Sequence, residues 1–339
     1  GAADDIINGG NGNDVIAGDS GNDSVSGGAG ADSLSYENHS VSVIASISSI
    51  TTLGNGASGE SDQVAGDFEN LVGGSAADIL TGSASDNQII GGPGNDQLIG
   101  GAGSDYFSGG DGSDTVSYAA SIGTVSAILG SALTSGNGVA NENDSIESDV
   151  ENLVGGLSSD TLSGNALVNV LNGGDGDDTL RGFSGDDQLN GGLGNDTVVG
   201  GLGNDTLSGG SGTDTLSYES HTANITVALA TIETVGNGAA GESDTVTGDF
   251  ENLTGGAGSD SLTGNLADNV LSGGSGNDEL FGLSGNDILI GTSGDDTFSG
   301  GLGTDTASYA YATDAITASL SDTSSAGNGQ VNELSLIHI

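Results

Sequence analysis

The chain has 339 residues, among them 66 Gly, 48 Asp plus Glu and a single Lys or Arg, and its formal net charge is −47 at pH 7. Nucleic acids and anionic membranes are bound through Lys and Arg side chains that meet phosphate, so this composition excludes both as partners held by charge. The lack of Cys excludes disulfides, thiolate metal sites and cysteine nucleophiles, and the charge balance favours multivalent cations as partners.

A nine-residue repeat, Gly-Gly-x-Gly-x-Asp-x-U-x with U a large apolar residue, accounts for most of the chain. In chain order the repeats form runs at 1–35, where the first unit is truncated, and at 73–117, 155–217 and 255–308. The runs differ in length by whole nonapeptides. Such variation is typical of a solenoid, which tolerates the gain or loss of single coils.

Spacers of 37 residues separate the runs, at 36–72, 118–154 and 218–254, and a truncated fourth spacer covers 309–333. Each complete spacer opens with Tyr, continues with alternating apolar residues such as Val43, Ala45 and Ile47, and contains a Gly-Asn-Gly sequence. The alternation predicts a strand, and the Gly-Asn-Gly sequence predicts a turn. The closing Leu71 keeps the apolar position of the repeat, which predicts that the solenoid continues through the spacer.

The last residues, Leu-Ser-Leu-Ile-His-Ile at 334–339, match the translation of a transposon-end sequencing adaptor. The parallel with the other spacers also stops there, since Glu333 still corresponds to Glu60 and nothing after it does. We expect an adaptor-derived tail, with a natural hydrophobic strand as the alternative. Both ends of the chain are expected to be truncated, and the region is expected to be continuous with further domains.

The apolar and acidic positions of the repeat can be explained physically. Position eight is apolar in every nonapeptide, and a three-residue strand points that side chain inward, so each stacked coil adds one residue to an apolar column. The aspartates at position six then lie one rung, about 4.8 Å, apart and repel each other by roughly 3.5 kcal/mol at an effective dielectric constant near 20. Carboxylate and carbonyl oxygens in flexible turns favour Ca²⁺ over Mg²⁺ or Zn²⁺ as the neutralising ion.

The units GGLGNDTVV, GGLGNDTLS and GGSGTDTLS, at 191–217, resemble the RTX, or haemolysin-type, calcium-binding nonapeptide repeat. The resemblance covers nearly the whole chain. It implies an all-β, right-handed parallel β-roll with two nonapeptides per coil. It also implies multiple Ca²⁺ ions held between turns two units apart by position-six aspartates and turn carbonyls, in a bacterial protein exported by type I secretion.

The resemblance carries the calcium ligands over to the position-six aspartates of the turns that keep the glycine at position four. These predicted metal ligands are Asp14, Asp23, Asp32, Asp96, Asp105, Asp114, Asp178, Asp187, Asp196, Asp205, Asp214, Asp260, Asp278, Asp287, Asp296 and Asp305. Turns with Asn at position six, at Asn87, Asn169 and Asn269, are expected to bind no ion. Pairing of intact turns 18 residues apart predicts about eight ions.

Other polar residues carry weaker signals. His39 and His221 occupy equivalent places in two spacers, but the chain has neither an HExxH nor a GxSxG motif, so we interpret them as ordinary loop histidines and predict no catalytic residue and no cofactor besides Ca²⁺. The acidic group Glu60, Asp62 and Asp67, which the other spacers repeat, is either an extra calcium site or merely solvated.

We predict that calcium binding drives the folding and rigidity of a secreted region that is extracellular or attached to the cell surface. The sequence is compatible with two kinds of parent protein. One is a long exported adhesin or surface protein, and the other is a secreted hydrolase or epimerase with its catalytic domain upstream of these repeats. Four runs separated by spacers favour the long structural protein.

Overall fold

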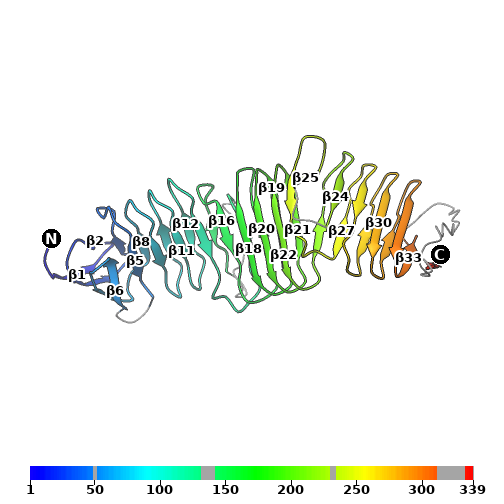
Figure 1. Ribbon diagram of the computed structural model, residues 1–339. Coiled ribbons are helices and arrows are strands. Elements are labelled where there is room, and N and C mark those ends of the chain that lie inside the picture. Colours follow the sequence, from blue (N-terminus) through cyan, green and yellow to red (C-terminus); the bar gives the residue numbers. More distant parts are fainter. Residues whose placement is uncertain (49–51, 131–141, 230–233, 311–332, 339) are drawn as a thin grey trace. The chain divides into compact units, whose positions relative to one another are not determined.

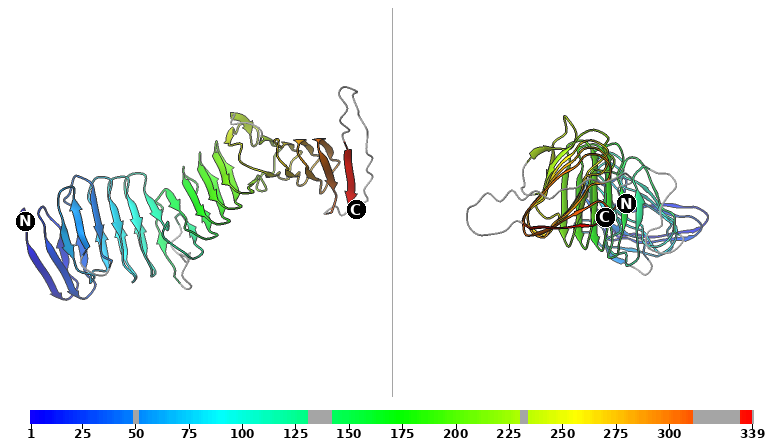
Figure 2. Two further views of the ribbon diagram at one scale, coloured as in Figure 1. Left: turned by 60° about the horizontal axis from the view of Figure 1, so that its bottom comes forward. Right: turned by 90° about the vertical axis from the view of Figure 1, so that its right-hand side faces the viewer.

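The computed structural model describes residues 1–48, 52–130, 142–229, 234–310 and 333–338. These residues form strands and turns and contain no helix, and therefore no helix that could span a membrane. The chain divides into two compact units, Gly1–Asn165 and Ala166–Ile339. Within each unit, short strands lie side by side like the rungs of a ladder (Figures 1 and 2). The boundary between the units falls inside the run predicted at 155–217, so the predicted limits of runs and spacers stay a prediction.

The first unit contains strands β1 to β17. In chain order they are β1 Ile6–Asn11, β2 Val15–Ala17, β3 Ser24–Ala29, β4 Ser33–Ser35, β5 Val43–Ser46, β6 Thr52–Ala57, β7 Asp62–Val64, β8 Asn70–Val72, β9 Ile79–Thr81, β10 Gln88–Ile90, β11 Gln97–Ile99, β12 Tyr106–Ser108, β13 Thr115–Ser117, β14 Ser126–Ile128, β15 Ser145–Ile146, β16 Asn152–Val154 and β17 Thr161–Ser163. One face follows the order β1-β3-β7-β6-β5-β9-β11-β13-β16, and another follows β2-β4-β8-β10-β12-β15.

The second unit contains strands β18 to β34. They are β18 Val170–Asp175, β19 Thr179–Ser184, β20 Gln188–Leu193, β21 Thr197–Leu202, β22 Thr206–Ser211, β23 Thr215–Ser217, β24 Thr226–Ala228, β25 Thr234–Asn237, β26 Asp244–Val246, β27 Asn252–Thr254, β28 Ser261–Thr263, β29 Val270–Ser272, β30 Glu279–Ser284, β31 Ile288–Ile290, β32 Thr297–Leu302, β33 Thr304–Ser308 and β34 Glu333–His338. Its sheets follow the orders β18-β20-β22-β26-β25, β19-β21-β23-β27-β29-β31-β33-β34 and β24-β28-β30-β32.

Strands inside a run pair in parallel with the strand two nonapeptides later. Thr179 of β19 lies opposite Thr197 of β21, and Gln188 of β20 lies opposite Thr206 of β22. Two nonapeptides therefore make one coil, and like positions of the repeat stack on like positions. This register confirms the parallel β-roll predicted from the repeat.

The core is the column of position-eight side chains. Every one of them is buried except Phe298 and Ile7 of the truncated first unit, which are half-buried, and even the small Ala307 is only 3% exposed. Full burial of a Leu contributes roughly 1.5–3 kcal/mol, so a core with one such residue per nonapeptide is thin.

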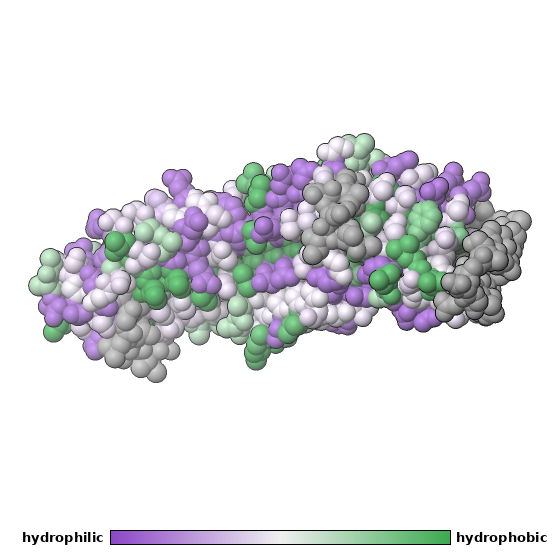
Figure 3. Space-filling view, in the orientation of Figure 1, coloured by the Kyte–Doolittle hydropathy of each residue, from purple (hydrophilic) through white to green (hydrophobic). Residues whose placement is uncertain are grey.

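Most outward strand positions are polar, although a few apolar side chains such as Val170 and Ile288 are exposed there. Asn204 donates its backbone N–H to Asp186 of the previous coil at 2.9 Å, and hydrophilic residues cover much of the face seen in Figure 3.

The spacers continue the coil stack, as predicted. In the first spacer, Gln63 of β7 lies opposite Ser24 of β3, and Asn70 of β8 lies opposite Ser33 of β4. The predicted alternation is confirmed as well, because Val43, Ala45 and Ile47 are all buried. Since β5, β6 and β7 all join one face while only β8 joins the other, the spacer adds more strands to one face than to the other.

One detail differs from the expectations, and a second concerns the C-terminal tail. The Gly-Asn-Gly sequence of the first spacer lies within β6, where the pairing with β7 is irregular and Gly56 has a φ of 105°, and the turn follows it at Ser58 and Gly59. Glu333–His338 form β34, which pairs in parallel with β33. The origin of residues 334–339 stays a prediction.

Candidate metal sites

The position-six aspartates lie in the turns that lead into each strand, and they are buried. Their exposed fraction is at most 2% for all predicted ligands except Asp14 and Asp296, which are partly exposed. Acidic side chains are seldom so deeply buried unless they are paired with a cation or hydrogen-bonded. Their burial follows from the repeat, since the aspartate precedes the inward-pointing apolar residue by two positions on the same face.

One oxygen of each carboxylate accepts a hydrogen bond from a backbone N–H group of the previous coil. The backbone N–H of Asp178 donates to Oδ1 of Asp196 at 2.7 Å, and the N–H of Asp196 donates to Oδ1 of Asp214 at 2.8 Å. The same bond joins Asp78 to Asp96 and Asp96 to Asp114, each at 2.8 Å. The aspartates therefore form columns in which each carboxylate stands one coil above the next.

The second oxygen of most of these carboxylates is buried and has no hydrogen-bond donor. These Oδ2 atoms belong to Asp14, Asp32, Asp96, Asp105, Asp114, Asp187, Asp196, Asp205, Asp214, Asp278 and Asp287. A buried carboxylate oxygen without a donor is costly. Its repetition along the columns indicates a partner that is not part of the chain.

The glycines at position one leave the space that such a partner needs. A Cβ built on Gly191 would collide with Oδ2 of Asp196 and, at 2.5 Å, with the carbonyl oxygen of Gly209 in the next coil. Gly192 and Gly194 have φ values of 116° and 127°, which favour glycine. The turn therefore brings a carboxylate oxygen and a carbonyl oxygen of two successive coils to one point, and such oxygen ligands fit Ca²⁺.

Burial gives these carboxylates unusual acidities in the metal-free chain. It raises the pKa of Asp105 and Asp205 to about 7, and it raises the pKa of Asp96 and Asp187 to about 6. Neighbouring carboxylates raise the pKa further, as Asp144 does for Asp105. Near neutral pH the coil stack therefore disfavours the charged form, which a bound divalent cation stabilises by supplying positive charge between the coils.

The first turn after a spacer differs from this pattern. Oδ2 of Asp78 accepts the N–H of Gly74 at 2.6 Å, and Oδ2 of Asp260 accepts the N–H of Gly256 at 2.8 Å. Neither glycine has a positive φ, whereas the equivalent Gly274 has one of 92°. Because the backbone turns its N–H toward the carboxylate, both oxygens are satisfied without an ion. The sequence predicted Asp260 as a calcium ligand, but both of its oxygens already accept backbone N–H groups, so we expect it to contribute less to ion binding than Asp278.

This contrast leads to a matched test. Asp278→Asn is expected to raise the calcium concentration at the folding midpoint by roughly tenfold, equivalent to 1.4 kcal/mol, because it removes the open oxygen. Asp260→Asn should remove only a hydrogen-bond acceptor, at about 1 kcal/mol of unfolding free energy, and leave the number of bound ions unchanged. Calcium titration followed by circular dichroism and an ion count would measure both. A larger midpoint shift for Asp260→Asn would contradict this reading of the geometry.

The turns with Asn at position six also satisfy the hydrogen bonds of that side chain without an ion. Asn87 accepts the N–H of Ser83 at 2.6 Å and donates its own amide to the carbonyl oxygen of Glu69 at 3.1 Å. Asn269 does the same with Asn265 and Glu251, at 2.8 Å and 2.9 Å. A neutral amide fills the position without an ion, which supports the expectation that these turns bind none.

The spacer acids have hydrogen-bond partners of their own. Asp62 is 1% exposed and accepts the N–H of Asp23 at 2.9 Å and the hydroxyl of Tyr36 at 3.1 Å. Asp67 accepts the N–H groups of Gly27 and Gly28, both at 3.0 Å, and these bonds, with one from the Ser26 hydroxyl, hold its pKa below the ordinary value despite partial burial. Asp62 is thus not solvated, and neither acid has the donor-free carboxylate oxygen found in most repeat aspartates.

The sequence analysis did not predict that a glutamate near the end of each spacer takes the place of the position-six aspartate. Glu69 accepts the N–H of Asp32 at 2.7 Å, and Glu151 and Glu251 make the same bond with Asp114 and Asp214 at 2.8 Å and 2.9 Å. The signal was present, since the Glu-Asn-Leu that closes each spacer aligns with the Asp-x-U of the repeat. No three His, Asp or Glu side chains cluster around one point within the described ranges.

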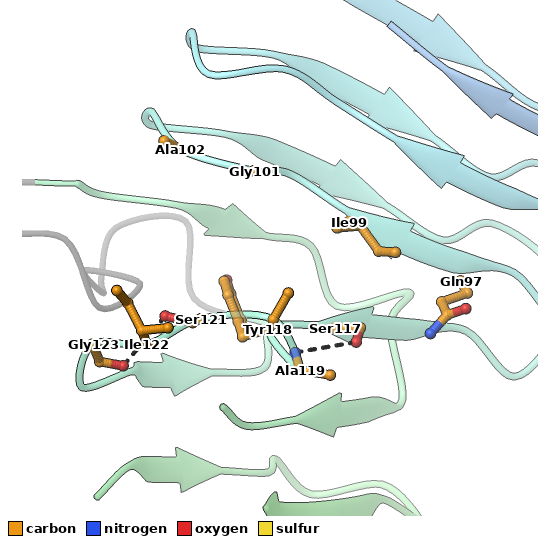
Figure 4. A pocket seen from close by; sticks show the side chains of 11 residues that line it. Gln97, Ile99, Gly101, Ala102, Ser117, Tyr118, Ala119, Ser121, Ile122 and Gly123 are labelled. Carbon is orange, nitrogen blue, oxygen red and sulfur yellow. Dashed lines mark hydrogen bonds between the residues drawn. The ribbon is translucent and has the colours of Figure 1, made fainter. Parts of the chain in front are cut away.

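One histidine and one surface pocket illustrate the remaining polar and hollow features of the described residues. His221 is 4% exposed, packs edge-on against Tyr218 and lies 3.2 Å from Glu242. A pocket of 410 Å³ lies where the second spacer leaves the coils (Figure 4), with Ile99 and Ile122 among its walls and no acid, histidine or cation among the described residues that line it. His39 and His221 lie in loops between strands, as predicted, and both are buried there.

Comparison with known proteins agrees with this geometry. A family model for the RTX calcium-binding nonapeptide repeat, in four copies, matches more than half of the chain, over residues 1–34, 65–98, 81–116, 147–180, 163–198, 191–220, 245–280 and 272–307. No curated protein matches the chain. The matched segments extend into the closing end of every complete spacer, and into the opening end of the third spacer, where the coil stack also continues.

Proposed function

Because this chain belongs to the RTX calcium-binding nonapeptide-repeat family, we propose that its calcium binding drives the folding and rigidity of a secreted region in a large exported adhesin or surface protein. The chain binds multiple Ca²⁺ ions and folds as a β-roll. The proposed role places the folded form outside the cell, where the protein would act as a stiff spacer or display element and carry no catalytic centre in this region.

The buried, donor-free Oδ2 atoms of the position-six aspartates carry this proposal. A coil stack that buries one carboxylate per turn is stable only when cations neutralise the columns. Extracellular calcium sites bind with Kd values of about 10⁻⁴ to 10⁻³ M. Such sites are filled outside a cell and vacant in a cytoplasm, so folding is coupled to export.

Limited proteolysis at two buffered calcium levels tests this coupling. Below about 10⁻⁶ M Ca²⁺ we expect rapid cleavage along the whole chain, and near 10⁻³ M we expect resistance. A chain that resists equally at both levels would refute the proposed link between export and folding. Sequencing of the gene upstream separates the two kinds of parent, since an HExxH or GxSxG domain there would favour a hydrolase and further runs with spacers would favour an adhesin.

The excess of acidic over basic residues also determines which partners we propose for the chain. With one Lys or Arg among 339 residues, and with that residue, Arg181, lying 3.3 Å from Glu219, the region has no basic surface for nucleic acid or anionic lipid. Calcium ions are the partners that its charge favours.

A further inference from the structure

A pocket of 390 Å³ lies at the opening of the third spacer, within the second unit. One wall comes from the outer face of β19 and β21, and the other from residues 220–223 and Ala239 of the spacer. Val198 points into the core, so its neighbour Val199 faces outward, yet Val199 is only 5% exposed. The volume lies in the range of about 300–1,000 Å³ that is usual for ligand pockets.

The strand wall of this pocket carries large exposed apolar side chains. Phe183 is 53% exposed and Leu202 is 57% exposed, and both line the pocket. In the pairing of the two strands, Arg181 lies opposite Val199 and Phe183 lies opposite Gly201. Because Gly201 has no side chain, the pocket stays open beside the ring of Phe183.

The backbone of Phe183 has a conformation that favours glycine. Its φ is 75°, and the same repeat position in the following turns is held by Gly192, Gly201 and Gly210, with φ values of 116°, 112° and 104°. A bulky residue with a positive φ is strained, and such strain is concentrated at functional sites. Since the ring is also half-exposed, core packing does not explain why Phe183 replaces the glycine.

The spacer wall is held in place by its own hydrogen bonds. The backbone N–H of His221 donates to the carbonyl oxygen of Tyr218 at 2.9 Å. Nε2 of His221 lies 3.2 Å from Oε2 of Glu242, which also accepts the N–H of Ala239 at 2.9 Å. The two sides of the spacer wall are therefore joined through one carboxylate, and the pocket is preformed, as ligand pockets usually are.

The pocket shown in Figure 4 lies at the equivalent place of the second spacer, with Ile99 in its wall. Counted back from the opening tyrosine of each spacer, Thr81 and Ser83 of the second run correspond to Arg181 and Phe183 of the third. The hollow is therefore common to both spacers, whereas the aromatic ring and the cation are particular to the third.

These side chains define the chemistry of a guest. Arg181 is the only Lys or Arg of the chain, and its guanidinium lies 3.3 Å from Glu219. A guanidinium stacks on aromatic faces, and an aromatic ring such as that of Phe183 packs well against another ring. The net charge of −47, with Glu219 and Asp186 exposed near the pocket, attracts positive groups. The guest that fits both features is an aromatic group with positive charges beside it.

We propose that this pocket binds an aromatic side chain of a partner polypeptide, in a segment where Lys or Arg flanks the aromatic residue. The aromatic ring enters between Phe183, Leu202 and Arg181, and the flanking cations face the exposed acids. This inference goes beyond the proposed function and requires only that the coil stack is folded.

The full chain in saturating Ca²⁺ and physiological salt is titrated with the peptide acetyl-Lys-Trp-Lys-amide. Since the chain has no Trp, the fluorescence of the peptide reports binding directly. Phe183→Gly is expected to weaken the affinity about tenfold, because it removes half-buried apolar contact area, and to leave the calcium midpoint of folding unchanged or lower. Leu283→Gly is the matched control, since Leu283 has a φ of 76°, is 40% exposed and lies outside the pocket. It should bind the peptide like the unmodified chain.

A second pair of variants separates the pocket from the repeat. Leu202→Ala should weaken peptide binding, whereas Leu193→Ala should not, although Leu193 holds the same repeat position one unit earlier and is 55% exposed. Equal affinities of the unmodified chain, Phe183→Gly and Leu202→Ala would refute the site. Loss of the β-sheet signal by Phe183→Gly in saturating Ca²⁺ would show that the ring is structural, which also refutes it.

Two further ligands test the commitment to a basic aromatic segment. Acetyl-Lys-Ala-Lys-amide should displace the Trp peptide poorly, and displacement at equal concentration would show that charge alone attracts the peptide and would overturn the proposal. Acetyl-Trp-amide should bind more weakly than the peptide. If it bound as tightly, the pocket would be one for free aromatic molecules, and the assignment to a polypeptide partner would be wrong.

Discussion

Chelation of calcium by EDTA is expected to abolish most of the β-sheet circular dichroism of the full chain, and millimolar Ca²⁺ is expected to restore it. Two carboxylates one rung apart repel by roughly 3.5 kcal/mol at an effective dielectric constant near 20. Several such pairs exceed the 5–15 kcal/mol by which a typical domain is stable. The position-eight column, with one apolar residue per nonapeptide, is too thin to offset this repulsion.

Mg²⁺ and Na⁺ are the controls for this experiment. Mg²⁺ requires close octahedral geometry and loses its water reluctantly, so at equal concentration it should not restore the signal. Na⁺ at matched ionic strength screens exposed charges but reaches buried ones poorly. Equal β-sheet content in EDTA and in Ca²⁺ would show that the coil stack is stable without metal.

A reversal of the pH dependence between the metal-free and the calcium-bound chain is the second large effect that we expect. Burial raises the pKa of Asp105 and Asp205 to about 7 and that of Asp214 and Asp278 to about 6, from 3.8 in the unfolded chain. For a raised pKa, the folded chain binds protons more tightly than the unfolded one. Folding stability without metal is therefore greatest below pH 4 and is lost as the pH rises through 6 to 7.

Calcium inverts this trend, because protons compete with the ion for the same oxygens. The calcium midpoint should rise by roughly tenfold for each pH unit below the pKa of one ligand carboxylate. Circular dichroism at pH 4.5 and pH 8, in EDTA and in Ca²⁺, measures both trends. High NaCl is the control for general repulsion among exposed acids, which salt screens. Metal-free β-sheet signal that stays equal at both pH values would contradict the assigned burial of these carboxylates.

The sequence alone was sufficient for the architecture. A nine-residue period with one apolar and one acidic position indicated a solenoid with a buried position-eight column and columns of aspartates. The parallel β-roll with two nonapeptides per coil was implied by the resemblance to the RTX repeat. The continuation through the spacers followed from Leu71 in the same way, and its pairing beside Leu34 confirms it.

The tertiary structure decided which aspartates keep a carboxylate oxygen without a hydrogen-bond donor. The turns at 255–260 and 273–278 share the pattern GGxGxD, yet only the second turns the N–H of its second glycine away from the carboxylate. The first stacks on a spacer, where the carbonyl of His221 abuts Gly256, and the second stacks on another repeat. Glu151 is the converse case, a residue outside the repeat that the fold brings to the aspartate position. Composition and period determine which residues face each other in neighbouring coils, but the backbone conformation of each turn depends on the coil beneath it, and that conformation decides whether a carboxylate meets an N–H group or a metal ion.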